Sequence, residues 1–125
     1  MPDRPVLKPS EKHPITVTPT AGRVVVTVGG KVVADTRASL TLQESTYPAV
    51  QYVPLTDVDE SLLERTATES YCPFKGDASY YSIPAGGDKA VDAVWEYQNP
   101  HDAVAEIKGH IAFYPDRVDA IAIEE

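Results

Sequence analysis

The segment from Tyr71 to Asp77, with sequence YCPFKGD, gathers the residue types best suited to chemistry. It holds Cys72, the only cysteine of the chain, and Lys75 three residues later. A cationic group near a cysteine favours the nucleophilic thiolate, so a turn that folds Lys75 over Cys72 would activate the thiol. The structural alternative is a small buried cysteine and a surface lysine whose aliphatic stem covers apolar atoms.

Large aromatic side chains follow this segment closely. Tyrosine and tryptophan can form a core, or the wall of an apolar pocket with polar handles. If the molecule has a functional pocket, we expect it to be the largest hollow, with Cys72 and Lys75 at its border and aromatic residues from 80–81 and 95–97 as its wall. The candidate ligand-binding residues are therefore Tyr71, Cys72, Lys75, Tyr80, Tyr81, Trp95 and Tyr97.

Other kinds of site find little support in the sequence. The histidines His13, His101 and His110 are scattered and the cysteine is single, so we expect no metal and no cofactor. Glycine-rich phosphate loops and the G-x-S-x-G nucleophile motif do not occur. Asp57 and Asp59 have the spacing of a two-carboxylate magnesium site, but we interpret Asp57 as a helix cap and Asp59 as a first-turn acid.

The charge distribution argues against nucleic-acid binding. The net charge is −8 at pH 7, and residues 38–125 alone carry −11. Because such an acidic body repels phosphate groups, we expect no nucleic-acid partner. No apolar stretch approaches the roughly 20 residues that cross a membrane, and no signal peptide is visible. We therefore expect no membrane partner and a cytoplasmic protein.

The length of 125 residues fits one domain preceded by an arm. Residues 1–14 hold four of the eleven prolines, which predicts an extended N-terminal arm. Residues 15–125 are predicted to form a single β-rich domain. Its clearest element is a hairpin over 23–36, in which Gly29 and Gly30 join two runs rich in β-branched residues.

Later segments predict short strands and little helix. We expect a helical turn capped by Asp57, and a helix that begins after Asn99 as N-cap, packs through Ala103, Val104 and Ile107, and ends before Gly109. Residues 110–114 and 117–123 predict a last hairpin. With about eight or nine strands and one strand–helix–strand unit, the fold class is a mainly β, antiparallel, barrel-like or folded sheet.

Several motifs in the same order resemble the bacterial domain of unknown function 427 family. They are DVDESLLERT at 57–66, CPFKGDASYYS at 72–82, AVWEY at 93–97 and HIAFYPDRV at 110–118, and the similarity runs from about Gly22 to Asp119. The resemblance implies a compact body of the type called a β-tent. Distant relatives in fold hold Zn²⁺ with paired C-x-x-C knuckles, which a chain with one cysteine cannot do.

Three functions are consistent with these observations. The preferred one is a small-molecule-binding module with an aromatic wall, in which Lys75 orients an anionic group and Cys72 packs at the base. A thiol-dependent enzyme with Cys72 as its nucleophile lacks a visible base and a resolving cysteine. A protein-interaction domain is the third. The sequence leaves open the ligand, the oligomeric state and whether the protein is an enzyme.

Overall fold

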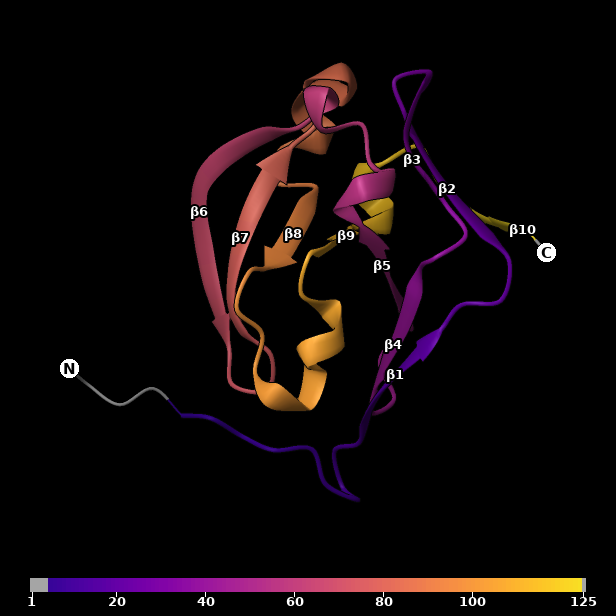
Figure 1. Ribbon diagram of the computed structural model, residues 1–125. Coiled ribbons are helices and arrows are strands. Elements are labelled where there is room, and N and C mark those ends of the chain that lie inside the picture. The colour runs from indigo at the N-terminus through magenta and orange to yellow at the C-terminus, as the bar shows by residue number, and fades with distance from the viewer. Residues whose placement is uncertain (1–4, 125) are drawn as a thin grey trace.

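The computed structural model describes residues 5–124, which form two antiparallel β-sheets (Figure 1). A seven-stranded sheet has the order β1-β4-β5-β9-β8-β7-β6, and a three-stranded sheet has the order β10-β2-β3. The strands are β1 (Ile15–Pro19), β2 (Arg23–Val28), β3 (Lys31–Thr36), β4 (Leu40–Glu44), β5 (Val50–Pro54), β6 (Glu64–Cys72), β7 (Gly76–Ser82), β8 (Val94–Tyr97), β9 (His110–Phe113) and β10 (Ala120–Glu124). The predicted mainly β, antiparallel fold is confirmed, but the sheets do not close into a barrel.

The hairpin of β2 and β3 forms as its sequence predicts. Gly29 and Gly30 both have positive φ, at 58° and 77°, which a two-residue hairpin turn requires and glycine adopts without strain. On β2 the side chains alternate, so that Val24, Val26 and Val28 are buried. These valines face the seven-stranded sheet and belong to the larger of two hydrophobic cores.

The two faces of the seven-stranded sheet contribute to different cores. On β9, Ile111 and Phe113 belong to the core against the three-stranded sheet, whereas Ala112 belongs to the second core. Likewise Val53 and Tyr52, neighbours on β5, point to opposite cores. This period of two is what a strand buried on both faces produces. The second core, which also contains Leu42, Ala78, Tyr97, Val104 and Ile107, lies beneath the candidate site.

All helices in residues 5–124 are 3₁₀ helices, and none of them is long and apolar enough to cross a membrane. They are η1 (Leu55–Asp57), η2 (Glu60–Leu62), η3 (Pro84–Ala90), η4 (Asp102–Ile107) and η5 (Pro115–Arg117). Helix η4 buries Val104 and Ile107 as predicted, and Gly109 follows it with φ at 77°.

Three local predictions are wrong. Helix η4 begins after His101 and has no side-chain cap, so Asn99 is not its N-cap. Asp59, not Asp57, caps a helical turn: its carboxylate accepts from the Ser61 amide at 3.2 Å. The last hairpin does not form either, because β9 pairs with β5 and β8 while β10 pairs with β2 in the other sheet.

The N-terminal arm crosses the lower end of the molecule (Figure 1). Residues 5–14 contain no strand, and residues 1–4 of the predicted arm lie outside the described residues. The Leu7 amide donates to the Pro73 carbonyl at 2.9 Å, and the Tyr71 hydroxyl donates to the Pro5 carbonyl at 2.7 Å. The arm thus contacts the β6–β7 turn, which carries Lys75.

Candidate functional site

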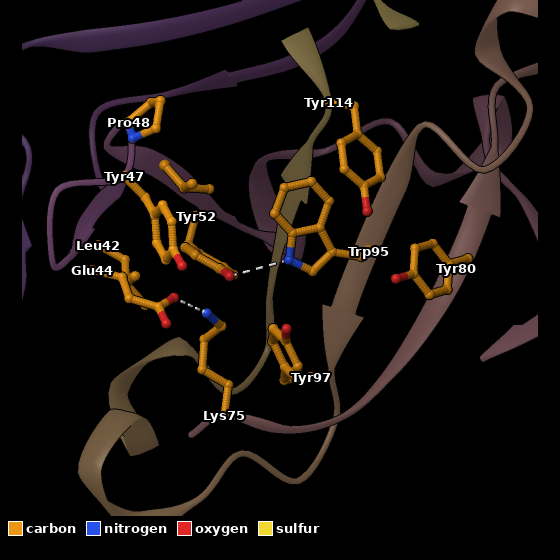
Figure 2. A pocket seen from close by; sticks show the side chains of 11 residues that line it. Leu42, Glu44, Tyr47, Pro48, Tyr52, Lys75, Tyr80, Trp95, Tyr97 and Tyr114 are labelled. Atoms are coloured by element: carbon orange, nitrogen blue, oxygen red, sulfur yellow. Dashed lines mark hydrogen bonds and ion pairs between the residues drawn. The ribbon is translucent and has the colours of Figure 1, made fainter. Parts of the chain in front are cut away.

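A small pocket opens on the second-core face of the seven-stranded sheet (Figure 2). It has a volume of about 170 Å³, and a cavity of about 150 Å³ accommodates a benzene-sized molecule. We call it the tyrosine pocket. Its lining consists of Leu42, Glu44, Tyr47, Pro48, Val50, Tyr52, Lys75, Tyr80, Trp95, Tyr97 and Tyr114.

The pleat of the sheet brings most of these side chains to one face. Strand β4 supplies Leu42 and Glu44, and strand β8 supplies Trp95 and Tyr97, in each case two residues apart. Strand β5 supplies Val50 and Tyr52, again at a spacing of two, and β7 supplies Tyr80. Loops complete the wall: Tyr47 and Pro48 come from the β4–β5 turn, Lys75 from the β6–β7 turn and Tyr114 from the end of β9.

An ion pair closes one end of the pocket. The Lys75 ammonium bonds to Oε1 of Glu44, and Nε2 of His13 lies 2.8 Å from Oε2 of the same carboxylate. The His13 ring stacks on Phe74 at 4.1 Å between centroids, which fixes its position. Burial acts to raise the pKa of Glu44, but hydrogen bonds from Lys75 and His13 outweigh it and lower that pKa. Glu44 is therefore ionised at neutral pH.

The aromatic wall is held by hydrogen bonds between polar tips. Nε1 of Trp95 donates to the Tyr52 hydroxyl at 3.1 Å, and the Tyr80 hydroxyl lies 2.7 Å from Oγ of Ser70. Burial raises the pKa of both Tyr52 and Tyr97 far above the ordinary tyrosine value. Burial, followed by a hydrogen bond with Tyr80, raises the pKa of Tyr114 to about 12. These phenols are neutral hydrogen-bonding groups at neutral pH, not bases.

The structure brings four of the seven candidate residues together. Lys75, Tyr80, Trp95 and Tyr97 line the tyrosine pocket, whereas Tyr71, Cys72 and Tyr81 do not. Two hollows are larger, at about 670 and 570 Å³, and neither Lys75 nor Cys72 lines them. The expectation that both residues border the largest hollow is therefore wrong. Lys75 is also paired with Glu44, so its charge is already engaged and is not left to orient an anionic group.

The other three candidates are Tyr71, Cys72 and Tyr81, and each makes contacts that serve the fold. Cys72 is a half-buried free cysteine packed against the second core. The Tyr71 hydroxyl lies 3.3 Å from Nε2 of His101 and also bonds the N-terminal arm. The Tyr81 hydroxyl donates to Glu96 at 2.8 Å on the opposite face of the sheet, and Glu96 is 5% exposed.

Sequence reasoning missed the half of the site that comes from β4 and β5. It named no pocket role for Glu44, Tyr47, Tyr52, Tyr114 or His13. The alternation in 40–44 and 50–54 indicates which residues share a face, so Glu44 could be placed beside Leu42, and Tyr52 beside Val50. Nothing local indicates that β5 pairs with β9, which is what brings these residues opposite Trp95.

Among residues 5–124, no cluster of three or more histidine, cysteine or acidic side chains is placed to hold a metal ion. The two carboxylates with metal-site spacing serve local structure. Asp57 accepts a hydrogen bond from the Thr36 hydroxyl at 2.6 Å, and Asp59 accepts from Ser61.

The fold and the pocket define a small two-sheet antiparallel β domain with a tyrosine-lined hollow on one face. The chain belongs to the family described as domain of unknown function (DUF427), whose profile matches residues 16–124. The resemblance noted from the motifs is thereby confirmed. No curated protein matches the chain.

Proposed function

We propose that the protein binds a small molecule in the tyrosine pocket. The observation that carries this proposal is the convergence of polar groups on one ring-sized space. Figure 2 shows the Tyr52 and Tyr97 hydroxyls and the Lys75 ammonium directed toward the same region of the pocket. Concave sites with aromatic walls and a few convergent polar groups are typical of ligand binding.

The charges at the pocket favour an uncharged ligand. Lys75 and Glu44 have 12% and 13% of their side chains exposed and neutralise each other. An anionic ligand would have to compete with Glu44 for Lys75, and a cationic one with Lys75 for Glu44. A neutral ring with a hydroxyl or carbonyl group instead bonds to the phenols and stacks on Trp95 without breaking the pair.

A titration with phenol tests the proposal directly. Trp95 is the only tryptophan of the chain, so intrinsic fluorescence reports on the wall of the pocket. We expect phenol to change this fluorescence with saturation, and to raise the melting temperature by mass action. Fluorescence that changes only linearly with phenol, with no thermal shift from phenol or from other neutral single-ring compounds, contradicts the proposal.

A pair of tyrosine variants locates the binding. Tyr97→Phe removes a hydroxyl from the pocket and should weaken phenol binding about threefold to tenfold, the effect of one hydrogen bond. Tyr71→Phe removes a hydroxyl outside the pocket lining and is the matched control, with phenol affinity expected to be unchanged. Equal weakening in both variants would place the phenol elsewhere.

A further inference from the structure

The tyrosine pocket adjoins a larger hollow through a shared wall. This second hollow, which we call the apolar groove, has a volume of about 570 Å³. Five residues line both spaces: Tyr47, Pro48, Val50, Trp95 and Tyr114. Tyr47 and Pro48 lie on one side of the pocket, and Trp95 and Tyr114 lie on the other with ring centroids 4.5 Å apart (Figure 2). The two spaces are therefore neighbours along one surface.

The groove differs from the pocket in chemistry. It runs where the two sheets meet, and its other lining residues are Val26, Ala49, Gln51, Val53, Phe113, Pro115, Ile121 and Ile123. No lining residue in the described part of the chain is charged. The Gln51 amide is already occupied, because its oxygen accepts from Thr20 and Ser39 and its nitrogen donates to Thr41. The groove thus offers apolar contact, while the pocket offers hydrogen bonds.

The tyrosine pocket and the apolar groove also differ in volume. Ligand sites in proteins usually measure about 300–1,000 Å³. The tyrosine pocket alone, at about 170 Å³, is below that range and holds a ring. The pocket and the groove together fall within it. A ligand that fills both must be polar at one end and apolar along the rest.

We propose that the natural ligand is a neutral amphiphile, with a ring-sized hydrogen-bonding head in the tyrosine pocket and an aliphatic chain along the apolar groove. This inference rests on the proposed function, because the head occupies the same pocket. The shared wall explains the arrangement. Tyr114 has a hydroxyl that can face the head, and the rings of Trp95 and Tyr114 offer apolar faces to the aliphatic chain. Ile123 at the rim is 52% exposed, and a chain along the groove would cover it.

The test is a series of 4-alkylphenols from phenol to 4-hexylphenol, titrated against the Trp95 fluorescence. Burying one methylene group contributes enough to tighten binding about fourfold. We therefore expect the dissociation constant to fall about threefold to fourfold with each added methylene. An affinity that stays flat along the series overturns the amphiphile but leaves phenol binding, and so the proposed function, intact.

Two variants in the apolar groove and one control show where the alkyl chain of the ligand lies. Ile123→Lys and Ala49→Glu place a charge in the groove and should reduce the gain from phenol to 4-hexylphenol at least tenfold. Val32→Lys is the matched control, since Val32 is 53% exposed on a strand and does not line the groove. Ala49 is an exposed turn residue, so its variant provides the measurement if Ile123→Lys does not fold.

Three further outcomes distinguish between the proposed function, the two-part site and a dimer interface. Tyr97→Phe should weaken every member of the series by the same factor, because it acts on the head. If phenol fails to bind while 4-hexylphenol binds and responds to Ile123→Lys alone, the proposed function fails and so does the two-part site. Concentration-dependent dimerisation that Ile123→Lys abolishes, without any dependence on chain length, would assign the groove to a second copy of the protein and overturn the inference.

Discussion

At the scale of residues, the Glu44 carboxylate connects the separate segments that form the candidate site. Glu44 receives Lys75 from the β6–β7 turn and His13 from the N-terminal arm, which are 31 residues away in each direction. Burial alone would favour the protonated carboxyl, and the two donors reverse this preference. The electrostatic state of the pocket is therefore set by contacts between segments that are distant in sequence.

Glu44 should make the stability of the protein depend on pH. Because its pKa is lower in the folded chain than the ordinary 4.5, its stabilisation is complete above that value and is lost as the pH falls through the folded-state pKa. Glu44→Gln should cost about 1 kcal/mol near neutral pH, since the pair is partly exposed to solvent. The difference from wild type should shrink as the pH is lowered below 4.5 through the folded-state pKa, measured by urea unfolding.

The exposed Glu106 on η4 provides the control for this experiment. Glu106→Gln changes the net charge by the same amount without breaking the Glu44–Lys75 ion pair. A wild-type advantage over Glu44→Gln that does not depend on pH would show that the Lys75 and His13 contacts do not hold the carboxylate ionised.

The hydrogen bond between half-buried Tyr81 and buried Glu96 gives a second prediction at this scale. Tyr81→Phe leaves the Glu96 carboxylate, which is 5% exposed, without the hydroxyl that donates to it at 2.8 Å. An unsatisfied buried acceptor costs about 1–3 kcal/mol, so the free energy of unfolding should fall by that amount. Tyr47→Phe, at a tyrosine that is 59% exposed, is the control and should change little. Equal effects of the two changes on denaturant unfolding would refute the assignment.

The hairpin of β2 and β3 illustrates what local sequence determines at the scale of elements. Gly29 does more than turn the chain: its amide donates to Asp119 at 2.8 Å, and a Cβ there would lie 2.2 Å from the Ala85 carbonyl oxygen. Gly30 also has positive φ, but nothing lies within 4 Å of the position of its Cβ. The two glycines thus separate backbone strain from close packing.

Substituting each glycine by alanine should resolve these two effects. Gly30→Ala should cost about 1–2 kcal/mol, the strain of the left-handed region alone. Gly29→Ala should cost clearly more, because the same strain is joined by a collision with the backbone of η3 that no side-chain rotation relieves. Thermal or urea unfolding of both variants measures the difference. Equal losses would mean that η3 moves away freely from the hairpin.

The sequence predicts elements well where their causes are local and poorly where they are not. The Gly29–Gly30 turn and the buried face of η4 follow from neighbouring residues. The prediction of a last hairpin is wrong because the segments 110–114 and 117–123 are adjacent in sequence but pair with strands of different sheets. The predicted Asn99 cap is wrong because the backbone is still extended at His101, whose amide donates to the Lys75 carbonyl.

At the scale of the whole molecule, the contrast between local and long-range causes explains which residues of the candidate site the sequence could predict. Residues 75–97 are close in sequence and contain Lys75, Tyr80, Trp95 and Tyr97, which the sequence predicted together. Glu44 and Tyr52 reach them only because β5 pairs with β9, and β9 with β8. Such pairing depends on the packing of both cores, which no single segment of the sequence reveals.

The N-terminal arm connects both halves of this site from outside the cores. It bonds the β6–β7 segment through Leu7 and Pro5, and it bonds β4 through His13. Within residues 5–124, by contrast, every buried hydrophobic residue lies at Val24 or later. The arm should therefore support the fold without being needed to form it.

Deletion of residues 1–12 should lower the free energy of unfolding by about 1–3 kcal/mol, from the loss of the hydrogen bonds that Pro5 and Leu7 make with the β6–β7 segment. We expect one cooperative transition to remain. His13→Ala in the full chain should remove a separate contribution of about 1 kcal/mol, because His13 stacks on Phe74 and contacts Glu44. Lys12→Ala, at an exposed neighbouring residue, is the control. Circular dichroism with urea unfolding measures all three proteins. A truncated chain as stable as wild type would show that the arm is not fastened in solution, and one that fails to fold would make it part of the folding unit.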